Sequence, residues 1–140
     1  MDRAEAVQER QLGSGRTVLL VEDDDDTREA LEELLQQEGY DVMAARDGAV
    51  GLQLLQNGAG RHCDLVILDL MMPVMNGWDF RLKQKADPAI ADIPVLVMSA
   101  GTTIANVTNE LQAADYVTKP VDPRDLLRKV EQLACERSAR

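Results

Sequence analysis

Five short runs of apolar residues recur along the chain, and a stretch with helical character follows each of them. The runs cover residues 18–21, 40–44, 64–69, 93–98 and 115–118. Short continuous apolar runs are typical of parallel strands that are buried on both faces. The pattern therefore predicts five strands, each followed by a helix.

Signals for helix starts and ends lie in the intervals between these runs. Asp26 opens a capping-box pattern that predicts the start of the first helix, and Gly39 predicts its end. Asp47 is expected to cap the second helix, and Asp122 followed by Pro123 marks the start of the last one. Two further helices are predicted over 77–85 and 103–112.

The alternation predicts an α/β fold, in which five helices cover both faces of a doubly wound, five-stranded parallel sheet. The 140 residues fit a single domain. We expect that domain to span 16–136, between a flexible N-terminal tail over 1–15 and a short C-terminal tail over 137–140. Met1 and the short charged end favour a complete chain over a fragment.

Composition narrows the possible partners and surroundings. The net charge is −10, so the chain lacks the positive surface that nucleic-acid binding needs. No apolar run approaches the ~20 residues of a membrane span, and the N-terminus is unlike a signal peptide. Cys63 and Cys135 have neither a metal-ligand nor a disulfide spacing. We therefore expect a cytoplasmic protein that binds neither nucleic acid nor membrane. The lone His62 is assigned no role.

Chemically active side chains stand at the ends of four predicted strands: Glu22 with Asp23, Asp69, Ser99 and Lys119. Ligand sites in such sheets lie at the carboxyl ends of the strands. Three acids without a cation would repel one another, and Lys119 supplies only one compensating charge. A divalent cation would supply the rest, and oxygen ligands of this kind suit Mg²⁺.

Each of these residues also has an ordinary structural explanation. The acids at 24–26 could serve only to start a helix, Ser99 could be a turn residue, and Lys119 could be a surface lysine. That all of them lie at the ends of successive strands is much harder to attribute to chance. This placement favours a common site. Trp78 follows Asn76 and Gly77 and could lie near the acidic site, but we expect it to pack as a helix residue instead.

From about Thr17 to Leu133 the chain resembles the receiver domain of response regulators. The matching segments are 18–24, 64–69, 72–77, 98–100 and 116–120. Their order and spacing are far more specific than any one acidic pair. The resemblance implies a flavodoxin-like sheet with strand order 2-1-3-4-5.

The resemblance implies a role for each acid. Asp69 would be the phosphoacceptor, receiving a phosphoryl group from a phosphohistidine on a sensor histidine kinase or a phosphotransfer protein. Asp23, Asp69 and the backbone carbonyl of Met71 would bind Mg²⁺ directly, and Glu22 would act largely through a metal-bound water.

The resemblance also implies that three residues on the later strands respond to the phosphoryl group. Lys119 would pair with the phosphoryl oxygens, and the hydroxyl of Ser99 would turn toward them. Tyr116 holds the position of an aromatic residue that changes rotamer as the hydroxyl moves. The family usually has a cis peptide at the position of Lys119–Pro120, although a trans proline that ends the strand is also open.

Two departures from the family pattern concern regions beside the site. The segment between Ser99 and Tyr116 is about two residues short, and 103–112 is rich in poor helix formers. That helix is therefore predicted to be short, shifted or mobile, with an output face unlike that of other receivers. Met71 and Gly101 flank the site and cannot orient an attacking water, which predicts slow self-dephosphorylation.

The expected function is that of a single-domain response regulator, which is phosphorylated on Asp69 and signals by contacts with a downstream protein. It would catalyse only its own phosphorylation and dephosphorylation, as a monomer or a weak homodimer. The alternative is a receiver-fold interaction module that is never phosphorylated. A haloacid-dehalogenase-like phosphatase is disfavoured, because that family needs a second Asp two residues after the nucleophile, where this chain has Met71.

Overall fold

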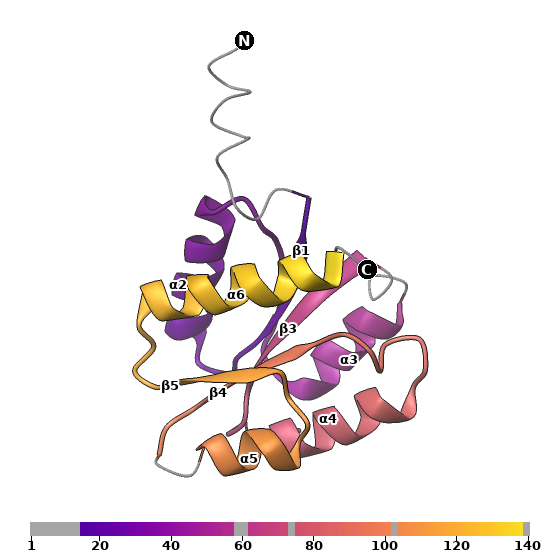
Figure 1. The fold of residues 1–140 in the computed structure, drawn as a ribbon. Helices are drawn as coiled ribbons and strands as arrows, with labels where there is room; N and C mark the ends of the chain where they lie inside the picture. The colour runs from indigo at the N-terminus through magenta and orange to yellow at the C-terminus, as the bar shows by residue number, and fades with distance from the viewer. Residues whose placement is uncertain (1–14, 58–61, 73–74, 102–103, 139–140) are drawn as a thin grey trace.

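The computed structural model describes residues 15–57, 62–72, 75–101 and 104–138. Its sheet contains five parallel strands in the order β2-β1-β3-β4-β5 (Figure 1). The strands are β1 Thr17–Val21, β2 Asp41–Ala45, β3 Cys63–Asp69, β4 Val95–Ser99 and β5 Asp115–Thr118. The predicted fold class and strand order are thereby confirmed.

In the described ranges, five helices cover the two faces of the sheet, and their numbering follows Figure 1. They are α2 Asp25–Gln37, α3 Gly48–Gln56, α4 Gly77–Ala86, α5 Ile104–Glu110 and α6 Pro123–Ser138. Helices α2 and α6 lie on one face, and α3, α4 and α5 lie on the other (Figure 1). Among the described residues, no helix has the length and apolar character needed to cross a membrane.

The four apolar residues of β1 alternate between two cores, because a separate core lies on each side of the sheet. Val18 and Leu20 belong to the core under α2 and α6, whereas Leu19 and Val21 belong to the core under α3 and α4. All four side chains are fully buried. Successive side chains of a strand point to opposite faces, so a sheet covered on both sides requires apolar residues throughout.

The start of α2 corrects one prediction. Asp24, not Asp26, is the N-cap, and its carboxylate accepts a hydrogen bond of 2.9 Å from the amide of Thr27. The acidic run offered several possible caps, and the helix begins directly after Asp24. Asp47 does cap α3, by accepting from the amide of Val50 at 2.9 Å, as predicted.

Helix α5 is the shortest of the helices in the described ranges, with seven residues. The prediction of a short helix is therefore confirmed, although residue 103 of the expected range lies outside the described residues. The turn after it includes Gln112 at a φ of 55°, a left-handed conformation that few non-glycine residues adopt. That α5 is mobile stays a prediction. The expected N-terminal tail lies almost wholly outside the described residues, and α6 continues past residue 136 to Ser138.

Candidate functional site

The carboxylate of Glu22 is built into the end of β1. Its amide continues the strand by donating to the carbonyl of Ala45 at 3.0 Å. Its side chain is fully buried, and Oε2 accepts from the amide of Asp24 at 3.1 Å. The guanidinium of Arg28 donates to the carbonyl of Glu22 at 3.0 Å and so fixes the backbone from the side of α2. Sequence reasoning missed this arginine, because nothing in its helical position distinguishes it from a surface residue.

Asp69 is the last residue of β3 and is only 2% exposed. Its Oδ1 accepts a hydrogen bond of 3.1 Å from the amide of Met71. The start of α4 is joined to the end of β3, since the amide of Gly77 donates to the carbonyl of Leu70 at 3.1 Å. A Cβ on Gly77 would lie 2.6 Å from Cδ2 of Leu70, so this approach of α4 to the site requires glycine.

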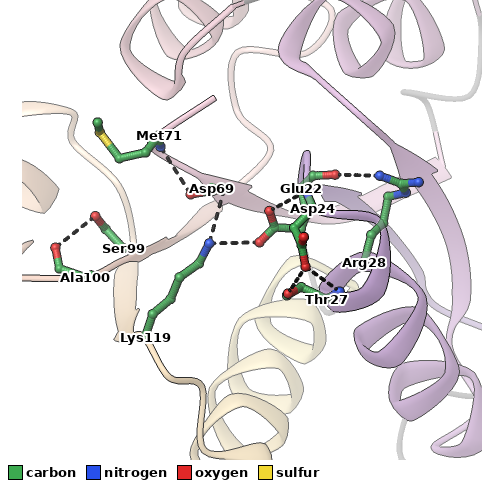
Figure 2. A network of polar contacts seen from close by, with 9 residues as sticks. All are labelled: Glu22, Asp24, Thr27, Arg28, Asp69, Met71, Ser99, Ala100 and Lys119. Atoms are coloured by element: carbon green, nitrogen blue, oxygen red, sulfur yellow. Dashed lines mark hydrogen bonds and ion pairs between the residues drawn. The ribbon is translucent and has the colours of Figure 1, made fainter. Parts of the chain in front are cut away.

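Lys119 joins the two buried acids. Its ammonium lies 2.9 Å from Oε1 of Glu22 and 3.2 Å from Oδ2 of Asp69 (Figure 2). Its amide donates to the carbonyl of Ser99 at 2.9 Å, which aligns the end of β5 with the end of β4. The peptide bond between Lys119 and Pro120 is cis, which settles the alternative left open by the sequence.

Three carboxylates at this edge could hold a metal ion together. Glu22, Asp23 and Asp69 each offer an oxygen, and these oxygens lie within 4.8 Å of one another. Three ionised carboxylates beside a single ammonium leave the site with a surplus of negative charge. A divalent cation would compensate that surplus, and carboxylate oxygens suit a hard ion such as Mg²⁺. The donor set therefore fits the metal that the sequence predicted.

The electrostatics of the two buried acids differ. Burial, followed by the nearby carboxylate of Glu22, raises the pKa of Asp69 to about 7. Burial also opposes the ionisation of Glu22, but hydrogen bonds from Lys119 and from the Asp24 amide outweigh it and lower the pKa of Glu22. Burial would lower the pKa of Lys119, yet its hydrogen bond to Glu22 raises that pKa instead. Without a metal, Glu22 is thus the more readily ionised of the two buried acids.

Ser99 ends β4 at the same edge but stands apart from this network. Its hydroxyl donates to the carbonyl of Ala100 at 3.2 Å (Figure 2). Tyr116 is half-buried on β5 against the core under α3, α4 and α5. The ammonium of Lys129 lies 5.0 Å from the centre of its ring and donates to its carbonyl at 2.5 Å. The contact between Lys129 and Tyr116, like that between Arg28 and Glu22, was not indicated by the sequence.

Two other residues weighed from the sequence lie elsewhere. His62 is exposed and directly precedes β3, at the opposite end of that strand from Asp69. Trp78 is 39% exposed on α4 and lines a groove on the outer surface with residues of α5. It is therefore a surface residue of its helix and only partly packed.

Comparisons with known proteins agree with this geometry. The model of the response regulator receiver domain family matches residues 18–131. The transcriptional regulatory protein CpxR of Escherichia coli is 37% identical over 118 residues, which cover 83% of this chain and 48% of that protein. GltR of Pseudomonas aeruginosa, also a transcriptional regulatory protein, is 34% identical over 86% of this chain and 49% of its own. The chain thus spans about half the length of the curated relatives it matches.

Solved structures with the same fold match this chain over nearly the whole of their own length. A putative response regulator from Chloroflexus aurantiacus has a TM-score of 0.79 and 30% identity, and it covers 87% of this chain and 99% of its own. The chemotaxis protein CheY4 of Vibrio cholerae has a TM-score of 0.75 and 26% identity, over 86% of this chain and 99% of its own. With the family model matched over most of its length and the acidic edge in place, this chain belongs to the response regulator receiver domains of two-component signalling.

Proposed function

We propose that this chain accepts a phosphoryl group on Asp69 from a phosphohistidine of a sensor histidine kinase or a phosphotransfer protein. The observation that carries the proposal is the position of the Asp69 carboxylate, at a strand end and 3.2 Å from the ammonium of Lys119. A buried carboxylate held beside a cation is a positioned nucleophile, and phosphoryl transfer depends mainly on positioning and charge neutralisation.

In the proposed reaction a carboxylate oxygen of Asp69 attacks phosphorus in line. The bond between phosphorus and the imidazole nitrogen of the donor breaks, and an acyl phosphate forms on Asp69. Asp23, Asp69 and the carbonyl of Met71 would hold Mg²⁺, with Glu22 supporting it less directly, and the bound ion would supply positive charge beside the phosphoryl oxygens. Lys119 already points its ammonium into this space and would pair with one of those oxygens.

Ser99 and Tyr116 would carry the response. Among the residues that the structure describes, the Ser99 hydroxyl has only the neighbouring Ala100 carbonyl as its partner, at 3.2 Å, so it can exchange that acceptor for a phosphoryl oxygen at little cost. Tyr116 lies on the next strand and packs toward α5. A movement of Ser99 would therefore reach the surface formed by α5 and β5, where we expect a downstream protein to bind.

Several finer statements stay predictions. One prediction is that the protein is a single-domain regulator that signals only through protein contacts. The curated relatives, however, are transcriptional regulators of about twice this length. The absence of nucleic-acid binding and a cytoplasmic location therefore also stay predictions. We do not expect activity beyond the domain's own phosphorylation and dephosphorylation. The alternative is an interaction module that is never phosphorylated; Lys119 would then only compensate the charge of the buried acids, and the three carboxylates that could hold a metal ion would have no role.

Incubation with Mg²⁺ and acetyl phosphate, followed by intact-mass measurement, tests the proposal. The wild type should gain one phosphoryl group, and Asp69→Ala should gain none. Asp92→Asn, which removes an exposed carboxylate away from the site, should be phosphorylated like the wild type. An unmodified wild type in the presence of Mg²⁺, or an adduct that persists in Asp69→Ala, would favour the interaction module.

The same samples test the persistence of the acyl phosphate. After removal of the phosphodonor, the adduct should decay slowly, because the exposed Met71 side chain and Gly101 offer no group to orient water toward phosphorus. A half-life of seconds at room temperature would contradict this expectation while leaving Asp69 as the acceptor.

A further inference from the structure

The outer face of α4 exposes apolar side chains that the phosphorylation site does not use. Trp78 is 39% and Leu82 is 73% exposed. The two residues are four positions apart and so lie on the same side of the helix. Phe80 and Arg81 are buried on its inner side. Within the described residues, two of the three exposed large hydrophobic residues therefore share one helix face, which marks a surface for association.

This face borders a groove of about 390 Å³ between α4 and α5. The walls of the groove are fixed to each other, because the guanidinium of Arg81 donates to the carbonyls of Leu111 and Gln112 at 2.9 and 2.8 Å. Its third contact, to Oε1 of Gln84 at 2.8 Å, anchors the arginine within α4. A preformed surface of this kind loses little conformational freedom when something binds to it.

Two charges on α4 flank Leu82 at equal spacing, and Glu110 of α5 adds a further acid to the lining of the groove. Asp79 and Lys85 both line the groove, three residues before and three residues after Leu82. In the described part of the chain, neither side chain takes part in an ion pair. A two-fold axis that passes by Leu82, perpendicular to α4, would place Asp79 of one copy opposite Lys85 of the other. The symmetry repeats this pair, so the dimer would contain two such contacts.

We propose that this surface binds a second copy of the chain through antiparallel packing of α4 against α4. A face that carries one acid and one base at equal distances from its centre is complementary to itself, as an isologous dimer requires. Leu82 would lie at the axis, and Trp78 would cover the groove of the other copy. Because ten helical residues span only about 15 Å, the contact is smaller than the ~800 Å² per partner of stable complexes. The dimer is therefore weak and depends on concentration.

Trp78 is the only tryptophan in the chain, so its fluorescence reports on this face alone. Sedimentation equilibrium and Trp emission should be measured from about 1 µM to about 1 mM. The wild type should dimerise over this range, with emission that shifts to shorter wavelength as Trp78 leaves water. Asp79→Lys alone and Lys85→Asp alone should each raise the dissociation constant at least about tenfold, because both pairs become repulsive. An equimolar mixture of the two variants should recover dimerisation. In the mixed dimer, the two lysines of one variant would face the two aspartates of the other, so both pairs become attractive again.

Two more variants separate this surface from any other. Leu82→Glu should abolish the dimer by placing two like charges at the axis. Lys83→Asp changes an exposed charge on α4 that does not line the groove, and should leave association unchanged. Circular dichroism of every variant checks that the fold is intact. A wild type that stays monomeric with constant emission overturns the proposal, as does a dimer that survives Leu82→Glu or a mixture that fails to associate.

Discussion

Two parts of the same sheet edge are organised differently. Glu22, Asp69 and Lys119, from the ends of β1, β3 and β5, are joined by contacts of 2.9 and 3.2 Å. Within the described ranges, the hydroxyl of Ser99, at the end of β4, is bonded only to the carbonyl of its neighbour Ala100. The charged part of the site is thus assembled in the resting protein, whereas the hydroxyl part is not.

The difference follows from the free energy that it costs to leave a buried carboxylate, or a hydroxyl, without a hydrogen-bond partner. The carboxylates of Glu22 and Asp69 are 0% and 2% exposed, and a buried charge without a partner costs several kcal/mol. The fold must therefore supply Lys119 before any ligand is present. A serine hydroxyl is neutral and can satisfy its donor with a nearby carbonyl at almost no cost. Charge has to be compensated during folding, and a hydroxyl is free to respond later.

Lys119→Met should have the largest effect on the resting protein. Without the ammonium, Glu22 and Asp69 would face each other as two buried acids with no cation. At pH 8 without divalent ions, the free energy of unfolding should fall by about 3 kcal/mol, as for other buried pairs that lose one partner. Urea unfolding measures this loss, and added Mg²⁺ should recover part of it by replacing the missing positive charge.

Lys83→Met is the matched control, because it removes an exposed lysine from α4. Its effect should stay within about 0.5 kcal/mol. If Lys119→Met lowers the free energy of unfolding no more than this control does, Glu22 and Asp69 share a proton and do not depend on the ammonium. The charged part of the site would then not be assembled as proposed.

Most of the fold was predictable because its signals are local. Apolar runs predicted all five strands, including the less buried edge strands β2 and β5, and the carboxylate of Asp47 caps its helix as predicted. The cap of α2 was misplaced by two residues, since Asp24, Asp25 and Asp26 are chemically equivalent in sequence and only the end of β1 selects among them. Strand ends also brought the predicted acids together, because parallel strands end at a common edge.

What the sequence could not provide were contacts between distant side chains. The bridge from Lys119 to Glu22 joins residues 97 positions apart, and the clamp from Arg81 to Leu111 joins residues 30 positions apart. Both depend on rotamers and on the spacing between packed elements. The resting position of the Ser99 hydroxyl is equally a matter of geometry, so its separation from the charged network became visible only in the structure.

A second prediction tests the charged part through its pH dependence. Since the pKa of Asp69 is raised to about 7, the folded protein keeps a proton there that the unfolded chain has already lost above about pH 4. Without divalent ions, the free energy of unfolding should therefore fall as the pH rises toward 7. The lowered pKa of Glu22 acts in the opposite direction, but only below its usual value of 4.5.

The Asp69 contribution is isolated by comparison with Asp69→Asn, which has no carboxylate to titrate. From pH 5 to 7.5 the wild type should lose on the order of 2 kcal/mol relative to this variant. Mg²⁺ should stabilise the wild type more at pH 7.5 than at pH 5, because metal binding needs ionised carboxylates. Parallel stability curves for the two proteins would mean that Asp69 is ionised throughout and already compensated by Lys119.

Ser99→Ala should have the smallest effect on the resting protein and so sharpens the contrast between the two parts of the edge. The hydroxyl is lost together with a single 3.2 Å bond to Ala100, and the free energy of unfolding should change by less than about 0.5 kcal/mol. Mg²⁺ affinity should also be unchanged, because Ser99 contacts none of the three carboxylates. After phosphorylation with acetyl phosphate, however, amide exchange at α5 and β5 should change in the wild type and not in the variant, since only a hydroxyl can turn toward the phosphoryl group. A large loss of stability or of Mg²⁺ affinity in unphosphorylated Ser99→Ala would show instead that Ser99 already belongs to the charged network.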